Sequence, residues 1–255
     1  IHSSAIIHSD AKISNKVEIG PYCVIGAGVQ IDENTKIHSH VNIIGNTTIG
    51  KNNEIFPFVS IGTPPQDLKY KGEKNSIIIG DNNKFREYVN INPGTSQGGT
   101  ITKLGNNNLL MVYSHVAHDC QVKNHLVMSS HAALGGHVEV GHHVNVGWGV
   151  GIHQFCRLGD HCMAAATATV LQDIPPFFTA SGNPAEVRGI NKVGLQRAGF
   201  SEAAISGVRK AYKQLYKKGL NRSQAIESII DSELSQIDEV QELVAFIKAS
   251  ERGIA

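Results

Sequence analysis

Acid–base chemistry is concentrated between residues 114 and 120, where the chain reads Ser-His-Val-Ala-His-Asp-Cys. Histidine is the usual general base near neutral pH, which makes His118 a candidate for that role. His115 and Asp119 lie close to it in the sequence. What such a base would act on depends on the residues that the rest of the chain places around it.

An isoleucine repeat predicts that surrounding structure. Isoleucine recurs at every sixth residue from Ile1 to Ile61. This spacing fits neither an α-helix nor an alternating strand, and it is typical of a parallel β-helix in which each hexad forms one short strand and one corner. Three hexads form one triangular coil of 18 residues, so residues 18 apart stack in a column.

The columns assign neighbours to His118. Val116 points inward, so His118 and Asp119 lie at a corner with outward side chains. The same corner holds Gly136 one coil later and Gln154 in the coil after that. A glycine beside a base leaves room for a substrate, and its N–H can hold an oxyanion. A base and an oxyanion donor without a Ser or Cys nucleophile favour direct acyl transfer.

Further polar side chains flank this column. His137 stacks beside Asp119, His115 lies just before the corner, and His153 precedes Gln154. Such a group can orient a sugar hydroxyl or a carbonyl. The alternative is a polar corner ladder without function, because corners of hexad repeats tolerate histidine and asparagine.

A zinc site is a second alternative. Hexapeptide β-helices also resemble the gamma-class carbonic anhydrases, which bind zinc through three histidines at a subunit interface. His115, His118 and His137 could serve as such ligands. The segment 63–78 and the basic tail described below have no role in that class of enzyme.

Two segments interrupt the repeat. Residues 63–78 are polar and lack the expected aliphatic residues, and the hexads resume at Ile79. A second break at 92–103 shifts the phase by one residue. Long polar loops that leave a regular scaffold are more often functional than not, although a tolerated surface insertion is the alternative for the first. The repeat then continues from Leu104 to Val170 and is expected to stop at Pro175-Pro176, which cannot continue a strand ladder.

Composition narrows the function classes. The 23 basic and 22 acidic residues nearly balance, so no global charge favours nucleic acid. No apolar run of membrane-spanning length and no signal pattern occur, which predicts a cytoplasmic protein without integral membrane association. The four cysteines all fall on the second inward position of a hexad, where a small apolar group is expected, so we expect core thiols rather than metal ligands or disulfides.

The pattern of apolar residues changes after Gly182-Asn183-Pro184. Helical patterns over 201–218, 223–234 and 237–252 predict a C-terminal α-helical domain, residues 185–255, behind a β-helix of residues 1–184. Between residues 197 and 222 a single acid, Glu202, accompanies a set of basic residues: Arg197, Arg209, Lys210, Lys213, Lys217, Lys218 and Arg222. They form either a solvated helix face or a surface for an acidic partner.

Several motifs together resemble one enzyme family. They are Pro65-Gln66-Asp67-Leu68-Lys69-Tyr70, His115 to Cys120, Gly136-His137-Val138, His153-Gln154-Phe155, Gln172 to Pro176, and Arg197-Ala198-Gly199-Phe200. With them the chain resembles, nearly end to end, the UDP-N-acetylglucosamine O-acyltransferases, the first enzymes of lipid A biosynthesis. The resemblance implies a left-handed β-helix, an exception to the right-handed crossover rule, and a homotrimer with active sites between subunits.

The resemblance also implies roles. His118 would remove the proton from the glucosamine 3-hydroxyl, which attacks the thioester of a (R)-3-hydroxyacyl group on the phosphopantetheine arm of acyl carrier protein. Gly136 N–H would hold the oxyanion and Asp119 would support His118. No metal or other cofactor is expected. Acyl carrier protein is acidic, which would give the basic helical residues a purpose.

Substrate-binding positions are carried over in the same way. They are Gln66, Asp67, Lys69, His115, His137, His153, Gln154, Ala166, Asn191 and Arg197. Ala166 aligns with a glycine at the floor of the acyl site, so its methyl group should favour a shorter chain. The chain departs from the family pattern at Asn92-Pro93, Val193 and Ala198. A 3-amino acceptor, which would give an amide, and a non-catalytic scaffold that binds acyl carrier protein stay open as alternatives.

Overall fold

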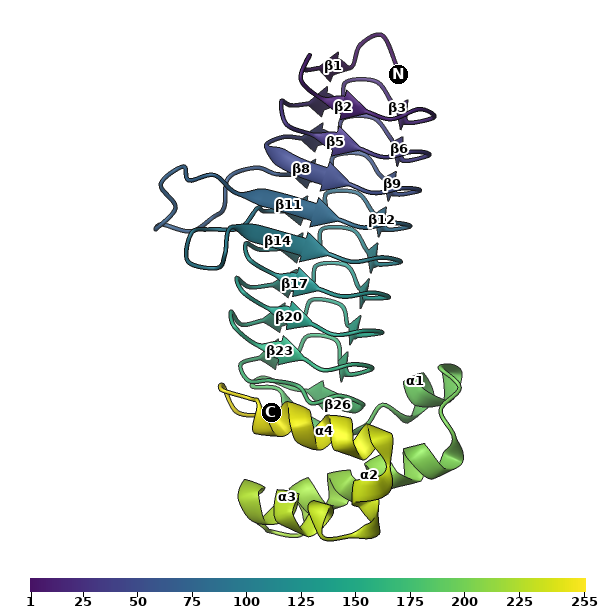
Figure 1. The fold of residues 1–255 in the computed structure, drawn as a ribbon, viewed down its shortest axis with the longest axis vertical. Coiled ribbons are helices and arrows are strands. Elements are labelled where there is room, and N and C mark those ends of the chain that lie inside the picture. Colours follow the sequence, from purple (N-terminus) through teal and green to yellow (C-terminus); the bar gives the residue numbers. More distant parts are fainter.

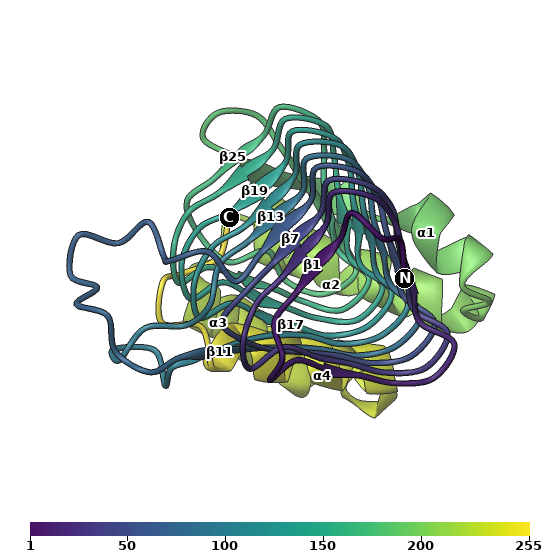
Figure 2. The same cartoon turned by 90° about the horizontal axis from the view of Figure 1, so that it is seen from above.

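The chain folds into a left-handed parallel β-helix that ends in a small group of helices (Figure 1). The computed structural model describes residues 1–255. Each coil contributes one short strand to each of three sheets, which form the sides of a triangular prism (Figure 2). No helix combines the length and the apolar character needed to cross a membrane.

Sheet 1 contains nine parallel strands in the order of the chain. They are β1 (Ile6–Ile7), β4 (Val24–Ile25), β7 (Asn42–Ile43), β10 (Ser60–Ile61), β13 (Asn90–Ile91), β16 (His115–Val116), β19 (Ala133–Leu134), β22 (Gly151–Ile152) and β25 (Thr169–Val170). Sheet 2 contains β2 (Lys12–Ile13), β5 (Gln30–Ile31), β8 (Asn46–Ile49), β11 (Ser76–Ile79), β14 (Ile101–Leu104), β17 (Gln121–Val122), β20 (Glu139–Val140) and β23 (Arg157–Leu158).

Sheet 3 closes the prism and continues past the prolines. It contains β3 (Glu18–Ile19), β6 (Lys36–Ile37), β9 (Glu54–Ile55), β12 (Lys84–Phe85), β15 (Leu109–Leu110), β18 (Val127–Met128), β21 (Asn145–Val146), β24 (Met163–Ala164), β26 (Phe178–Ser181) and β27 (Glu186–Ile190). The expected stop at Pro175-Pro176 was wrong, because β26 pairs in parallel with β24. The expected domain boundary at 184/185 falls inside the antiparallel β26–β27 hairpin.

The core follows from the repeat. In most strands the second residue is buried and the first faces outward, as the two-residue period of a strand requires. The inward residues stack into one cluster of 57 buried side chains. All four cysteines are free and buried in it, which confirms the prediction of core thiols. Burial raises the pKa of the Cys120 thiol to about 12.

The three corners differ in what they carry. We call them corner 1–2, corner 2–3 and corner 3–1 after the sheets that they join. The loop 63–75 lies between β10 and β11 and the loop 92–100 between β13 and β14, so both leave from corner 1–2. Figure 2 shows them projecting together from one edge of the prism.

Helices cover the carboxyl end. They are α1 (Lys192–Arg197), α2 (Glu202–Lys217), α3 (Arg222–Ile230), a 3₁₀ turn at Glu233–Gln236 and α4 (Asp238–Lys248). The sequence pattern missed α1, which is short and has a single buried residue, Leu195. Buried Ile205, Val208 and Ala211 of α2 pack into the same cluster as the solenoid core, so the helices and the β-helix share one core.

A buried ladder of asparagines occupies the second inward position at corner 2–3, where a small apolar group was expected. Asn53 Oδ1 accepts from the backbone N–H and the side-chain amide of Asn83, both at 2.9 Å. Asn83 Oδ1 accepts in turn from the Asn108 N–H at 2.9 Å. The amides supply buried partners for corner backbone groups, which apolar side chains cannot do.

Replacing the middle member of this ladder should destabilise the coils. Asn83→Ala leaves the Gly105 carbonyl and the N–H of Asn108 without their partners, at a cost of about 2–4 kcal/mol. We expect a clear fall in Tm in a thermal melt. Asn15→Ala, at an exposed corner, should change stability by less than about 0.5 kcal/mol. Equal losses of stability in the two variants would show that the asparagine ladder contributes no more than an exposed corner residue.

Candidate active site

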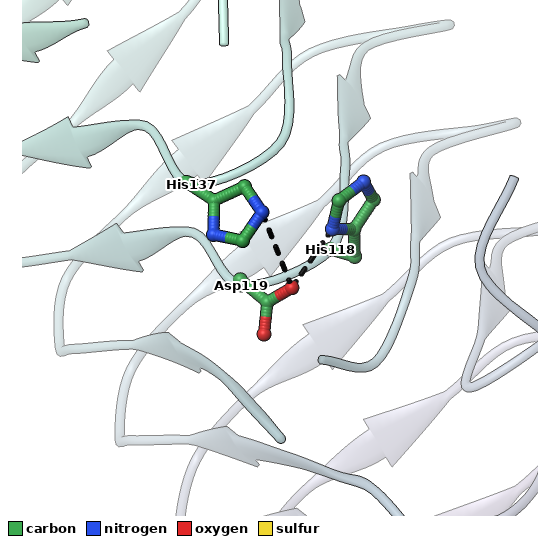
Figure 3. A group of neighbouring side chains, drawn as sticks. All are labelled: His118, Asp119 and His137. Atoms are coloured by element: carbon green, nitrogen blue, oxygen red, sulfur yellow. Dashed lines mark hydrogen bonds and ion pairs between the residues drawn. The ribbon is translucent and has the colours of Figure 1, made fainter. Parts of the chain in front are cut away.

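His118 and Asp119 form a hydrogen-bonded pair at corner 1–2, directly after β16 (Figure 3). The distance from His118 Nδ1 to Asp119 Oδ2 is 2.8 Å. Sequence neighbours on a strand face opposite sides, but Asp119 has a φ of 62°, which turns its side chain back toward His118. An ionised carboxylate only accepts, so His118 donates from Nδ1 and keeps Nε2 as an acceptor.

The loop 92–100 holds the Asp119 carboxylate. Thr95 donates its backbone N–H to Oδ1 at 2.9 Å and its hydroxyl to Oδ2 at 2.7 Å. The Asp119 side chain is fully buried. A Cβ on Gly98 would overlap the carboxyl group, so the loop needs a glycine there to close over Asp119. The carboxylate is thereby oriented before any substrate binds.

Sequence reasoning missed the threonines that serve Asp119. Besides Thr95, Thr102 accepts the backbone N–H of Asp119 on its Oγ1 at 2.8 Å. The one-residue phase shift marked the segment 92–103 as irregular, but it did not indicate that this segment holds Asp119. The available signal was that the loop and His118 share a corner, because residues 92 and 117 each directly follow a strand of sheet 1.

Gly136 lies against the imidazole of His118, as the column predicts. A Cβ on Gly136 would stand 2.5 Å from His118 Cε1 and 2.7 Å from Nε2. Its N–H has no acceptor within the chain. A free backbone donor therefore lies beside the atom of His118 that can take a proton.

His137 closes the other side of this pair. Its ring stands edge-on to His118, with centroids 5.1 Å apart, and stacks on Phe155 at 4.3 Å. Its Nε2 is 3.8 Å from Asp119 Oδ2. Burial lowers the pKa of His137 against the opposing charge of Asp119, which favours the neutral ring near pH 7. Burial likewise lowers the pKa of His115, on β16.

The loop 63–75 brings its polar residues to the same corner. Gln66 and Lys69 are exposed and Asp67 is half-buried. Burial has the largest effect on the pKa of His137, but the charge of Asp67 also raises this pKa and the charge of Lys69 lowers it. Lys69 Nζ lies 3.4 Å from Gln97 Oε1 of the second loop.

Two further contacts tie the loops into one unit. Glu73 Oε1 accepts the Ser96 N–H at 3.0 Å, and the Asn75 side-chain amide donates to the Gly94 carbonyl at 2.9 Å. The Ser96 and Lys71 amides lower the pKa of Glu73 to about 2, so this link is ionised over the physiological range. The first loop is thus supported by the loop that orients Asp119.

A single chain places the predicted site residues at all three corners. His153 and Gln154 are exposed at corner 1–2, one coil beyond Gly136. Ala166 lies at corner 3–1. Asn191 caps α1 and donates to the His161 carbonyl of corner 2–3 at 2.9 Å, and Arg197 ends the same helix, exposed. These last three do not meet His118 within one chain.

His118, Asp119 and His137 form a group that could hold a metal ion. Their nitrogen and oxygen atoms lie within 4.8 Å of one another. The short contact between His118 Nδ1 and Asp119 Oδ2, and the Thr95 hydroxyl on the same oxygen, already use these atoms for hydrogen bonds. His115 is not part of this group, so the three-histidine arrangement considered from the sequence does not form within one chain.

Comparisons with known proteins agree along the whole chain. A family model described as Udp N-acetylglucosamine O-acyltransferase; Domain 2 matches residues 173–255. Two curated relatives are named acyl-[acyl-carrier-protein]–UDP-N-acetylglucosamine O-acyltransferase. The one from Thermodesulfovibrio yellowstonii is 46% identical over 254 residues, covering 100% of this chain and 98% of its own. The one from Janthinobacterium sp. (strain Marseille) is 48% identical over 257 residues with the same coverage.

Solved structures share the fold closely. LpxA from Acinetobacter baumannii superposes with a TM-score of 0.97 at 47% identity, covering 100% of this chain and 98% of that one. The UDP-N-acetylglucosamine acyltransferase of Francisella novicida gives 0.95 at 41% identity, covering 99% and 92%.

A methyl group on Gly136 should displace the His118 ring. Gly136→Ala places its Cβ where the imidazole edge lies, so the Nδ1–Asp119 hydrogen bond must break or bend. The far-downfield Nδ1 proton signal of His118 in the NMR spectrum should then be lost. Gly189→Ala, whose Cβ meets nothing within 4 Å, should leave the signal in place. A retained signal in Gly136→Ala would contradict the close approach.

Proposed function

The chain belongs to the UDP-N-acetylglucosamine O-acyltransferase family, and from this we propose how corner 1–2 carries out its reaction. The enzyme transfers an acyl group from acyl carrier protein to UDP-N-acetylglucosamine, the first step of lipid A biosynthesis. We propose a (R)-3-hydroxyacyl group as the donor and the 3-hydroxyl of the glucosamine ring as the acceptor.

His118 acts as the general base. Its Nε2 takes the proton of the sugar hydroxyl while the oxygen attacks the thioester carbon. Asp119 keeps Nδ1 protonated and stabilises the imidazolium that forms, through the 2.8 Å hydrogen bond. The carbon–sulfur bond then breaks, and the proton passes from His118 to the departing thiolate. General-base catalysis of this kind contributes about 10²–10⁴-fold in rate.

Gly136 supplies the oxyanion donor. Its free N–H stands beside Nε2 of His118, where a thioester under attack would develop negative charge. One such backbone donor lowers the barrier by about 3–4 kcal/mol. The single observation that carries the mechanism is this pairing of an oriented base with an unused N–H.

The remaining site residues support substrate binding. Lys69, Asp67 and Gln66, on the loop 63–75, lie where they can contact the sugar and the phosphates beside His137. His115, His153 and Gln154 line the same corner. We assign Asn191 and Arg197 to the nucleotide, supplied across a subunit boundary because one chain leaves them apart from His118, and Ala166 to the far end of the acyl site.

A homotrimer completes the site. His118 and Asn191 lie at different corners, so a cleft between neighbouring copies can bring them together. The loop 63–75 also carries Leu68 with a relative exposure of 105%, an apolar side chain that a neighbour would cover. Closed three-fold symmetry gives three equal clefts.

The helices offer a surface to acyl carrier protein. Arg209, Lys210, Lys213, Lys217 and Lys218 of α2 and its C-cap are all exposed, while the apolar face of the helix is buried. An acidic carrier would be steered toward such a surface. A cytoplasmic location is part of the proposal, because both substrates are water-soluble.

Three other hypotheses lead to different observations. The named relatives are acyltransferases, which decides against the zinc-enzyme hypothesis and against a scaffold without activity. Transfer to a 3-amino sugar would give an amide in place of an ester. Mass spectrometry of products from UDP-N-acetylglucosamine and its 3-amino analogue distinguishes the two acceptors.

Removing the base should abolish transfer without unfolding the chain. His118→Ala should lower kcat by about 10³-fold or more, since both the base and its orientation are lost. Product formation is followed by mass spectrometry and assembly by light scattering. His8→Ala, an exposed histidine near the amino end, should keep full activity. Retained activity in folded His118→Ala protein would overturn the mechanism.

Complementation tests whether the site spans two subunits. His118→Ala and Arg197→Ala chains each lack a residue that every cleft requires. In randomly mixed trimers roughly a quarter of the clefts combine an intact His118 with an intact Arg197 of the neighbour. Co-expression should therefore restore activity well above either variant alone. No recovery in verified mixed trimers would place both residues in one chain's own site.

A further inference from the structure

Trp148 is the single tryptophan of the chain, and its side chain is exposed. It lies at corner 3–1, between β21 and β22, with a relative exposure of 55%. Gly147 and Gly149 flank it, so no neighbouring side chain in the sequence shields the indole. Its one aromatic neighbour is His131, edge-on with centroids 6.0 Å apart.

Trp148 shares a column with Ala166. The Thr167 N–H donates to the Trp148 carbonyl at 2.7 Å, and the Gly149 N–H donates to the Ser130 carbonyl at 3.1 Å. Successive coils therefore place Ser130, Trp148 and Ala166 at the same position of corner 3–1. The coil of His118 lies before Ser130, so along the axis of the β-helix Trp148 is nearer to His118 than Ala166 is.

The face of sheet 1 connects this column with the reacting atoms. Sheet 1 is the side of the prism that joins corner 3–1 to corner 1–2 (Figure 2). Its outward residues beyond His115 are Ala133 and then Gly151, as the strand register shows. A Cβ on Gly151 would meet nothing within 4 Å. Ser130 at corner 3–1 and Gly136 at corner 1–2 are six residues apart, and six residues of extended chain span at most about 20 Å. This distance is similar to the length of a fatty acyl chain.

From these positions we propose that Trp148 is the wall that ends the acyl-chain site and sets the chain length of the donor. The inference rests on the proposed acyl transfer at His118. A chain that starts at Gly136 and follows the small residues of sheet 1 reaches the level of Trp148 before that of Ala166. The indole stops it there, and the methyl group of Ala166 lies behind the wall.

The spacing of the coils sets the size of the effect. One coil is about 4.8 Å, the length of roughly four methylene groups in an extended chain. Trp148→Gly should therefore shift the preferred donor toward chains about four carbons longer. Ala166→Gly alone should shift nothing, but in the Trp148→Gly background it should lengthen the preference again.

Competition between acyl carrier proteins with graded 3-hydroxyacyl chains measures this preference, with products separated by mass spectrometry. Trp148→Phe should give an intermediate length. Tyr88→Ala is the matched control, because it removes an exposed aromatic side chain of the same corner on the far side of the His118 coil. The control should leave the preferred length unchanged.

Fluorescence provides a readout without turnover, since Trp148 is the only indole. Titrating His118→Ala protein with a 3-hydroxyacyl pantetheine thioester should shift the emission to shorter wavelength as the chain covers the ring. An emission that is already blue-shifted and unchanged by the thioester would mean that a neighbouring subunit buries Trp148, which overturns the proposal.

The outcomes separate this proposal from the one that it rests on. Absence of product with every chain length would refute the acyl transfer itself. Normal product formation with an unchanged length preference in Trp148→Gly would refute only the wall, as would a longer preference in Ala166→Gly with Trp148 intact.

Discussion

The parallel hydrogen-bond ladder between successive coils is the constraint on which everything else depends. From β1 to β25 it fixes the register of each strand to its neighbour 18 residues away, except where a loop has been inserted. Aliphatic side chains fill the interior as a consequence, and corner residues become columns. Gly136 approaches His118 because the ladder places it there, and its missing side chain makes the approach possible.

Both insertions lie at corner 1–2, and the ladder continues on either side of them. The strands that follow the two loops, β11 and β14, still pair with each other through four residues each, so the coils remain in register. The loops are free to differ from the repeat and to bring Thr95 to Asp119. The buried Asp119 carboxylate has three donors on its two oxygens, and two of these donors are the backbone N–H and the hydroxyl of Thr95 in the irregular loop.

Periodicity predicted the fold and the stacking at corner 1–2, because both follow from counting. It could not predict Thr95 or Thr102, since a loop outside the register has no column. The slot that holds Asn53 and Asn83 was expected to be apolar, because burial alone favours that and the unpaired backbone groups of corner 2–3 are invisible in a hydrophobic pattern. Strand β27 was missed because Asn183-Pro184 looks like an end, although it is the turn of a hairpin. In the proposed trimer Asn191 would meet His118 only across a subunit boundary, and no count within one chain can supply that neighbour.

The hydrogen bonds between Thr95 and Asp119 join a loop to a corner that is synthesised after it. Synthesis from the amino terminus delivers the loop 92–100 and Thr102 before the corner that carries His118. Gly136 and His137 arrive one coil later and close the site from the other side. A solenoid built coil upon coil thus presents the residues that orient the base earlier in the sequence than the donor that works with it.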